Sequence, residues 1–465
     1  MEIKSCLSKG RTYVAVRTIE AGTCLLREPP LTAVLNASLS YQPASFVLSR
    51  EEKVLFDAFP RGVEPMASLL AIRTFNLLRN NSAANIERDI QSLCDSHPAR
   101  RADYERGVEA CAQIVMKELV RTSSLAIKVS LPQVIQMLNR ISLNAFTLTD
   151  ETMQPIGLAL YAKAAVFNHS CCPNATQSFD LSSTGPILSI HANRNIHIGE
   201  EITISYIDVG FPSWWRRQEL FTSYGFICHC AHCCLADPIP DAFRCRLCEG
   251  NVTLSSTFYD MHYRAWLKHE LVSPLPCTSQ ASSDGNLPMP CAPIIASLKS
   301  SAYATLCLQC TRCKSTPSTS QILADLQLAS RRHSQMATGT EGKDSTRRVK
   351  GLQQVYTRLT ELLHSSHYAV VRVADEYNTA LVLNNDFEEA YEVSRRMHAG
   401  MRVVYSAASP VLSLHLLVFG KLALYCGKQT RAHSLLTEAL ELLQRTQGAT
   451  HPLTAQVKQL LRQPP

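Results

Sequence analysis

The sequence predicts an α+β protein in which strand-rich segments are interrupted by a helical insertion and followed by a cysteine-rich region and a helical domain. Apolar and polar positions alternate in residues 11–35, and strand patterns return from Asn144 to Tyr206. Residues 50–140 instead carry apolar residues at helical spacing, as in Met66–Leu78 and Val108–Val120. The period of the apolar pattern therefore switches twice along the chain.

Composition places the chain among globular proteins. It has 465 residues, of which 46% are hydrophobic and 18% charged, and a formal net charge of +7. No apolar run reaches membrane-spanning length, and residues 1–6 lack the apolar core of a signal peptide. We therefore expect a monomer in the cytosol or nucleus, with no membrane partner, and the mild positive charge does not indicate a nucleic-acid partner.

The last part of the chain predicts stacked helix pairs. Phe387-Glu-Glu-Ala390 and Gln429-Thr-Arg-Ala432 open similar helices, and each follows another helix. The two alanines are 432 − 390 = 42 residues apart, which exceeds the tetratricopeptide period of about 34 residues. A tetratricopeptide-like array of long helix pairs would bury a shared core by stacking and offers a surface for a peptide. A generic helical bundle is the alternative.

Three motifs follow one another in the middle of the chain. They are Asn168-His-Ser-Cys-Cys-Pro-Asn174, Gly199-Glu-Glu-Ile-Thr-Ile-Ser-Tyr206 and Cys228-His-Cys-Ala-His-Cys233. In this order they resemble the SET-domain lysine methyltransferases, and more closely the SET-and-MYND (SMYD) branch. The resemblance implies an enzyme that transfers a methyl group from S-adenosylmethionine to a lysine amine of a histone or non-histone protein, with structural zinc.

Such a reaction makes defined demands on a site. Methyl transfer from a sulfonium to an amine is an in-line displacement, and a lysine with an ordinary pKa of about 10.4 must lose its proton first. An apolar channel favours the neutral amine, and holding the reacting atoms in line removes much of the entropic barrier. The site needs aromatic side chains that surround the reacting atoms and hydrogen-bonding groups that bind the cofactor, rather than a nucleophilic side chain.

The resemblance assigns roles to individual residues. Tyr206 matches the catalytic tyrosine, and Phe146, Tyr206 and Tyr224 match the walls of the lysine channel. The expected cofactor-binding residues are Gly10, Arg11, Asn144, Asn168, His169 and Phe226. Each motif also has a bland interpretation: Asn-His-Ser is a common turn, and a tyrosine at a strand end is common in any sheet.

The amino-terminal motif departs from the family. A Gly-x-Gly turn is usual in SET domains, but Lys9-Gly-Arg-Thr-Tyr13 has Thr12 at the second glycine. Threonine lacks the conformational freedom of glycine, so cofactor affinity at this turn is in question. The MYND finger is also missing, since no cysteine lies between Cys24 and Cys94.

The cysteines predict two zinc sites. Eleven of the 18 lie between Cys228 and Cys313, and clustered cysteines in a reducing compartment favour metal over disulfides. Cys228, Cys230 and Cys233 are one ligand short of tetrahedral zinc, and the resemblance supplies Cys171 as the fourth. A second site is expected from Cys245, Cys248, Cys307 and Cys310, with Cys310-x-x-Cys313 as the alternative second pair.

Two other functions remain open beside the enzyme. A decayed SET fold acting as a peptide-binding scaffold and a nucleic-acid-binding zinc ribbon are these alternatives.

The expected organisation of the chain has six parts. The parts are the N-terminal part of the SET domain (1–40), its helical insertion (41–140), the core SET domain (141–226), the zinc-binding region (227–314), a linker (315–345) and the tetratricopeptide-like domain (346–465).

Overall fold

The computed structural model of the chain describes two compact units. One contains Met1–Tyr206, Leu220–Ile227 and Leu443–Gln456, and the other contains Ile207–Glu219, Cys228–Leu442 and Val457–Pro465. The residues that the structure describes are 1–6, 9–36, 46–59, 64–80, 84–95, 102–121, 129–181, 185–234, 242–248, 250–253, 309–316, 318–338, 345–405 and 407–462.

The strands of the first unit form small sheets, three of them among its described residues. The strand order is β1-β2-β10-β7 in one sheet, β3-β9-β8 in another and β4-β6-β5 in a third. The strands are β1 (Glu2–Cys6), β2 (Gly10–Val14), β3 (Cys24–Glu28), β4 (Thr32–Leu35), β5 (Ala145–Thr149), β6 (Pro155–Leu160), β7 (Asn168–His169), β8 (Ala175–Asp180), β9 (Ile187–Ala192) and β10 (Glu201–Ile204).

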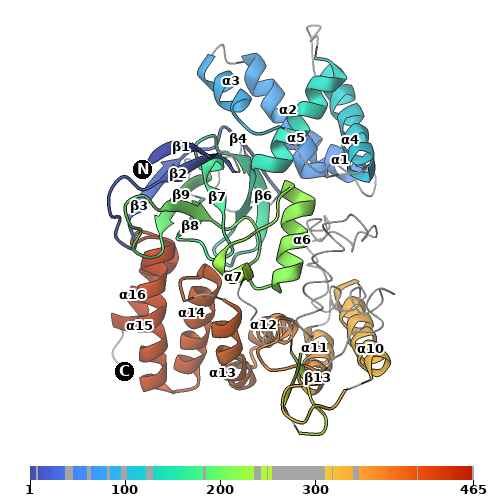
Figure 1. The fold of residues 1–465 in the computed structure, drawn as a ribbon, viewed down its shortest axis with the longest axis vertical. Coiled ribbons are helices and arrows are strands. Elements are labelled where there is room, and N and C mark those ends of the chain that lie inside the picture. Colours follow the sequence, from blue (N-terminus) through green and yellow to red (C-terminus); the bar gives the residue numbers. More distant parts are fainter. Residues whose placement is uncertain are drawn as a thin grey trace. The chain divides into compact units, whose positions relative to one another are not determined.

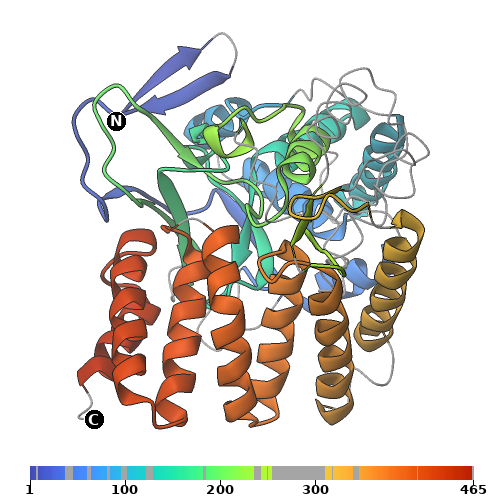
Figure 2. The same ribbon diagram turned by 60° about the horizontal axis from the view of Figure 1, so that its bottom comes forward.

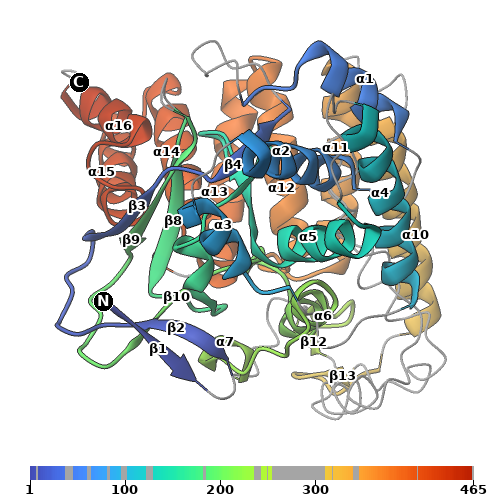
Figure 3. The same ribbon diagram turned by 90° about the horizontal axis from the view of Figure 1, so that it is seen from above.

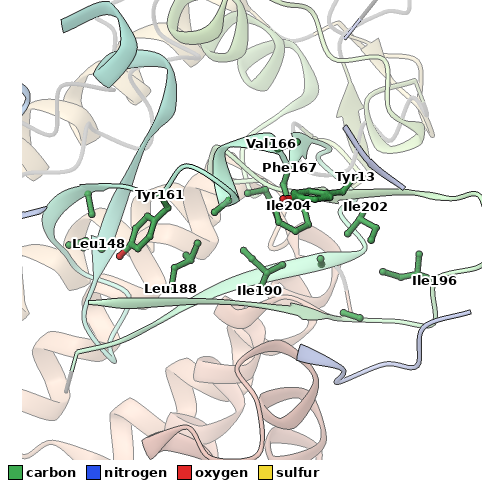
Figure 4. Close-up of a cluster of buried hydrophobic side chains, with 14 of the residues drawn as sticks. Tyr13, Leu148, Tyr161, Val166, Phe167, Leu188, Ile190, Ile196, Ile202 and Ile204 are labelled. Atoms are coloured by element: carbon green, nitrogen blue, oxygen red, sulfur yellow. The ribbon is translucent and has the colours of Figure 1, made fainter. Parts of the chain in front are cut away.

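Strand β10 separates an apolar face from a polar one. Its side chains alternate between the two faces, as in any strand. Ile202 and Ile204 are buried in the core beside Tyr13 and Phe167, whose ring centroids lie 4.5 Å apart (Figure 4). The intervening Thr203 and the preceding Glu201 belong to a polar network instead. The same four-residue strand therefore anchors the core and presents the site.

The helical insertion lies where the sequence predicts it. It contains α1 (Arg50–Ala58), α2 (Pro65–Asn80), α3 (Ala84–Gln91), α4 (Ala102–Arg121) and α5 (Leu131–Asn144). Helix α2 packs against β4, α4 and α5 through a second apolar cluster, and Figure 3 shows α2 beside β4. A proline occupies the first turn of α5, where its missing N–H leaves no helical bond unmade.

Asn174 ties the loop after β7 to strand β10. Its side chain is only 2% exposed. The amide nitrogen donates to Glu200 Oε1 at 2.9 Å and to the Glu201 carbonyl at 2.8 Å, while Oδ1 accepts the Thr203 N–H at 2.8 Å. Glu200 is itself held by Arg194, whose hydrogen bond helps to lower the pKa of this carboxyl to about 2. One buried amide thus supports the register between two site segments.

Replacing Asn174 with alanine is expected to lower the free energy of unfolding by about 2–3 kcal/mol, because buried polar groups of β10 lose their partner. Urea unfolding followed by circular dichroism measures the change. The matched control is Asn195→Ala, which removes an exposed amide that accepts one hydrogen bond from the Ala21 N–H. Equal effects of the two substitutions would contradict a special role for Asn174.

The second unit contains a small sheet and most of the helices that follow β10, although residues 220–227 and 443–456 belong to the first unit. Strands β11 (Phe243–Arg244), β12 (Asn251–Thr253) and β13 (Gln309–Cys310) pair in that order. Helix α7 (Ala231–Cys234) carries part of the first cysteine motif, and α6 (Ser213–Tyr224) precedes it. The carboxyl-terminal helices are α10 (Thr319–Thr338), α11 (Ser345–Leu362), α12 (Tyr368–Leu383), α13 (Phe387–Val404), α14 (Pro410–Tyr425), α15 (Gln429–Thr446) and α16 (Pro452–Arg462), labelled in Figure 1.

The prediction of a linker at residues 315–345 is wrong, because most of this segment is helical. Residues Thr319–Thr338 form helix α10. Ile322, Leu326 and Ala329 recur at helical spacing and are buried. The abundance of serine and threonine in this segment hid a narrow apolar stripe that α11 covers.

The paired helices of the carboxyl-terminal part are confirmed. Helices α10 to α14 pack successively, each against the next, and Figure 2 shows them as a row from yellow to red. Ala390 and Ala432, the two alanines of the 42-residue spacing, begin the buried faces of α13 and α15 and are fully buried. A Cβ added at Gly420 of α14 would lie 2.8 Å from Leu436, so glycine permits the close approach of α15. No helix among the described residues is long and apolar enough to span a membrane.

Candidate functional site

Strand pairing brings the separated motifs together. Strand β10 pairs antiparallel with β2, where Ile202 lies opposite Tyr13. On its other edge β10 pairs in parallel with β7, which sets Thr203 against Asn168 and Ile204 against His169. The Gly10 turn and the Asn-His segment therefore flank the strand that leads into Tyr206.

Asn168 is held in one orientation by two acceptors. Its Nδ2 donates to the Arg11 carbonyl at 3.2 Å and to Glu201 Oε1 at 2.9 Å. A carbonyl and an ionised carboxylate accept hydrogen bonds but do not donate them. If the Asn168 amide were flipped, Oδ1 would face both acceptors and could bond to neither, so the placement of its nitrogen and oxygen atoms follows from this chemistry. Both N–H groups are used within the protein, which leaves Oδ1 as the acceptor atom of this side chain.

Thr12 belongs to the same network. Its hydroxyl donates to Glu201 Oε1 at 2.7 Å, and Lys9 Nζ donates to Glu201 Oε2 at 2.7 Å. Burial opposes ionisation of Glu201, but the hydrogen bonds from Lys9, Asn168 and Thr12 outweigh it and lower the pKa of this carboxyl. Gly10 has a φ of 71°, whereas Thr12 lies within β2 and is not among the positive-φ residues. The departure from Gly-x-Gly therefore creates no backbone strain at Thr12.

His169 connects Tyr206 to a cysteine. The Tyr206 backbone N–H donates to His169 Nδ1 at 3.0 Å, and His169 Nε2 lies 3.2 Å from the Cys171 sulfur. Because Nδ1 accepts, the ring proton of the neutral imidazole is on Nε2 and faces that sulfur. The imidazole of His169 is thus a bridge between the loop of Cys171 and the end of β10.

Three aromatic side chains gather around Tyr206. Its ring centroid lies 4.9 Å from Tyr224, 5.3 Å from His169 and 6.4 Å from Phe226. The Tyr206 hydroxyl donates to the Phe167 carbonyl at 2.6 Å. Phe146, expected in the same channel, packs edge-to-face on Tyr161 at 5.6 Å. The electron-rich faces of this aromatic group suit a cationic ligand.

The phenol of Tyr206 is neutral. Burial raises its pKa well above the ordinary value, and the neighbouring Tyr224, Glu201 and Cys94 raise it further. A neutral phenol does not act as a general base at physiological pH. Its oxygen instead provides a polar contact at the edge of the aromatic group.

A segment that sequence reasoning missed lies between two predicted cofactor residues. The guanidinium of Arg11 donates to the Ser92 carbonyl, and Asn144 Nδ2 donates to the Cys94 carbonyl at 2.7 Å. Residues 92–94 follow α3, so the helical insertion contributes backbone to the site. No motif marks this segment, because its contribution is two carbonyl groups rather than side chains.

The first cysteine cluster has the arrangement of a closed metal site. The sulfur atoms of Cys171, Cys228, Cys230 and Cys233 lie within 4.8 Å of one another. A tetrahedral zinc ion with Zn–S bonds of about 2.3 Å holds its sulfurs about 3.8 Å apart, so the four fit it. The buried Arg216 guanidinium lies 3.6 Å from the Cys233 sulfur and donates a hydrogen bond to it.

Comparison with known proteins identifies the domain. Residues 10–207 match the family model of the SET domain. The chain carries a SET domain. It is SMYD-like: it is 38% identical over 94 residues to N-lysine methyltransferase SMYD2-A of Xenopus laevis (20% of this chain, 21% of that protein). It is 30% identical over 200 residues to Histone-lysine N-methyltransferase SMYD3 of Homo sapiens (41% and 44%).

A plant relative matches over a longer stretch. Histone-lysine N-methyltransferase ASHR1 of Arabidopsis thaliana is 23% identical over 335 residues, which are 72% of this chain and 61% of that protein. The chain spans less than two thirds of the length of each of these relatives. The SET match begins at Gly10 and ends one residue after Tyr206, so it contains the β2–β10–β7 arrangement described above.

A second cysteine cluster lies beyond the SET domain, on the β11–β12–β13 sheet. Cys245, Cys248, Cys310 and Cys313 form a potential metal site. The sulfurs of Cys248 and Cys310 are 3.5 Å apart, and those of Cys245 and Cys313 are 3.6 Å apart. The pair is therefore Cys310 and Cys313, the alternative in the sequence, and Cys307 lies outside the described residues. A Cβ at Gly250 would lie 2.9 Å from the Arg312 Cβ and 3.0 Å from the Cys310 sulfur, so a side chain there would crowd the cluster.

Proposed function

We propose that this chain is an S-adenosylmethionine-dependent protein-lysine N-methyltransferase. The observation that carries the proposal is Asn168, whose amide N–H groups are held by Arg11 and Glu201 so that Oδ1 remains as an acceptor, on the strand whose next residue, His169, packs on Tyr206. The three relatives named above are lysine methyltransferases. A histone or a non-histone protein that bears an accessible lysine is the proposed substrate.

The residues present fit this cofactor. S-adenosylmethionine supplies a methyl group on a cationic sulfur. Asn168 Oδ1 would accept a hydrogen bond from the cofactor's ammonium group, and the rings of Tyr206, Tyr224 and Phe226 would offer electron-rich faces to its positive charge. Desolvation among these rings favours the neutral form of the substrate lysine.

Tyr206 orients the reaction rather than taking a proton from the lysine. The Tyr206 hydroxyl donates its hydrogen to the Phe167 carbonyl, so the lone pairs of the hydroxyl oxygen point away from that carbonyl. Those lone pairs are then available to the amine and the polarised methyl group. Contacts that strengthen as charge moves in the transition state are the ones that raise kcat.

We further propose zinc as the metal of both cysteine clusters. Closed sites of four thiolates are typical of structural zinc, and no ligand position is left for catalysis. In the first cluster Cys171 lies two residues after His169, so metal binding holds the loop that carries the cofactor-binding residues. The proposed role is therefore support of the site.

Replacing Tyr206 with phenylalanine is expected to lower kcat by about 100-fold, the usual effect of removing one polar contact to the transition state. The affinity for S-adenosylmethionine should stay within about threefold, since the ring remains. Transfer of label from the cofactor to a protein library measures the first quantity, and calorimetry measures the second. Tyr425→Phe, at an exposed tyrosine of the helical domain, is the control.

The alternative of an inactive scaffold has a distinct outcome. A scaffold would leave every library protein unlabelled even though the purified chain binds the cofactor. Labelling by the wild type together with loss of label in Tyr206→Phe supports the enzyme. Equal labelling by both would remove Tyr206 from the reaction.

A further inference from the structure

One carboxylate oxygen joins Thr12 to Asn168. Glu201 Oε1 accepts the Thr12 hydroxyl at 2.7 Å and the Asn168 amide at 2.9 Å. The position of this oxygen therefore depends on the threonine, and the orientation of the Asn168 amide depends on the oxygen. The three residues come from β2, β10 and β7, the three adjacent strands of one sheet.

Thr12 is the rigid partner of Glu201. It is 6% exposed and lies in a strand that is paired on both edges, with β1 and with β10. Lys9 holds the other carboxylate oxygen, but its side chain is 55% exposed. An exposed lysine forms a mobile and solvent-screened ion pair. Without Thr12, the Glu201 carboxylate would keep only this loose contact and its bond to Asn168.

We propose that Thr12 is a positioning residue for cofactor binding. Its hydroxyl fixes Glu201, and Glu201 fixes the Asn168 amide, so that Oδ1 would be held ready to accept a hydrogen bond from the ammonium group of S-adenosylmethionine. This inference rests on the proposed function. It reverses the expectation from the family turn: restoring glycine at position 12 should weaken cofactor binding in this chain rather than improve it.

Three substitutions separate the hydroxyl from the backbone. Thr12→Ser keeps the donor, Thr12→Val keeps the shape and removes the donor, and Thr12→Gly restores the family residue. The control is Thr176→Val. Thr176 is also a buried threonine on a strand of the first unit, and its hydroxyl accepts a hydrogen bond from an asparagine amide, that of Asn193, at 3.3 Å. Thr176→Val therefore removes the same kind of group as Thr12→Val, a buried hydroxyl on a strand.

Calorimetric titration with S-adenosylmethionine is the deciding measurement. Thr12→Val and Thr12→Gly are expected to raise the Kd about 10-fold, the effect of one lost hydrogen bond to a charged group, and Thr12→Ser to stay within about threefold. Thr176→Val should leave the Kd within about threefold. Steady-state kinetics should show a higher KM for the cofactor at unchanged kcat, which a general loss of folding would not produce.

A second readout needs no ligand. In protein labelled with 15N-asparagine, the side-chain amide resonances of Asn168, assigned by their loss in Asn168→Ala, should shift in Thr12→Val and remain in Thr12→Ser. Unshifted resonances and unchanged Kd values in Thr12→Val and Thr12→Gly would overturn the inference while leaving the proposed function intact. A wild type that does not bind the cofactor would overturn the proposed function and the inference with it.

Discussion

Replacing Asn168 with alanine is expected to weaken binding of S-adenosylmethionine by about 100-fold or more, because an acceptor for a charged group is lost from a preorganised site. The asparagine is held by two protein acceptors before any ligand arrives, so binding does not have to order its side chain. The same substitution leaves Glu201 Oε1 with Thr12 as a partner. The affinity should therefore fall much more than the stability.

Aspartate at position 168 tests the direction of the amide. It retains acceptor oxygens but lacks both N–H donors, and it places a second carboxylate beside Glu201. Asn168→Asp is therefore expected to bind the cofactor as poorly as Asn168→Ala. Calorimetry on both variants and on the exposed control Asn195→Ala measures the effect. A Kd within threefold of the wild type in Asn168→Ala would place the cofactor elsewhere.

Loss of the second metal is the other large expected effect. The wild type should contain two zinc ions per chain, and Cys248→Ser should contain one and lose about 3 kcal/mol or more of stability in the second unit. The β11–β12–β13 sheet consists of strands of two, three and two residues. A sheet of this size has too little apolar area to fold without a metal or a covering element.

The effect should spread into the adjoining helices. Arg246, between two cysteines of the cluster, donates to Asp325 of α10 at 2.8 Å, and Arg358 of α11 contacts the same carboxylate. Elemental analysis gives the metal content, and hydrogen exchange reports on residues 309–338. Exchange in α10 should rise in Cys248→Ser and stay unchanged in Cys426→Ser, a cysteine outside both clusters. Two zinc ions in Cys248→Ser would exclude this cluster as a zinc site.

The fold was largely predictable because its signals are local. The helical insertion and the paired helices carry apolar residues at a regular spacing, and this spacing depends only on neighbours along the chain. Helix α10 escaped prediction since its stripe of Ile322, Leu326 and Ala329 is narrow and is diluted by serine and threonine. Packing on α11 decides that this segment is a helix, and such packing has no mark in a local window.

The candidate site likewise has features that the sequence shows and features that only the structure shows. The residue types at Asn168, Tyr206 and the four cysteines of the first cluster are visible in the sequence because chemistry restricts them to a few kinds. The roles of Thr12, Glu201 and Asn174 are not, since each acts through a hydrogen bond to a residue far away in the chain. The place of Cys313 in the second cluster likewise depends on which sulfurs the β12–β13 pairing brings together.

The sequence by itself determined the class of the domain, the order of its motifs and the residue types available for methyl transfer and for metal. Only the tertiary structure decided how these residues are oriented. Orientation follows from strand register and from hydrogen bonds between residues far apart in the chain, such as Thr12 and Glu201, which are 189 positions apart. A threonine that departs from the family turn is, in the folded chain, a donor to the carboxylate that holds Asn168.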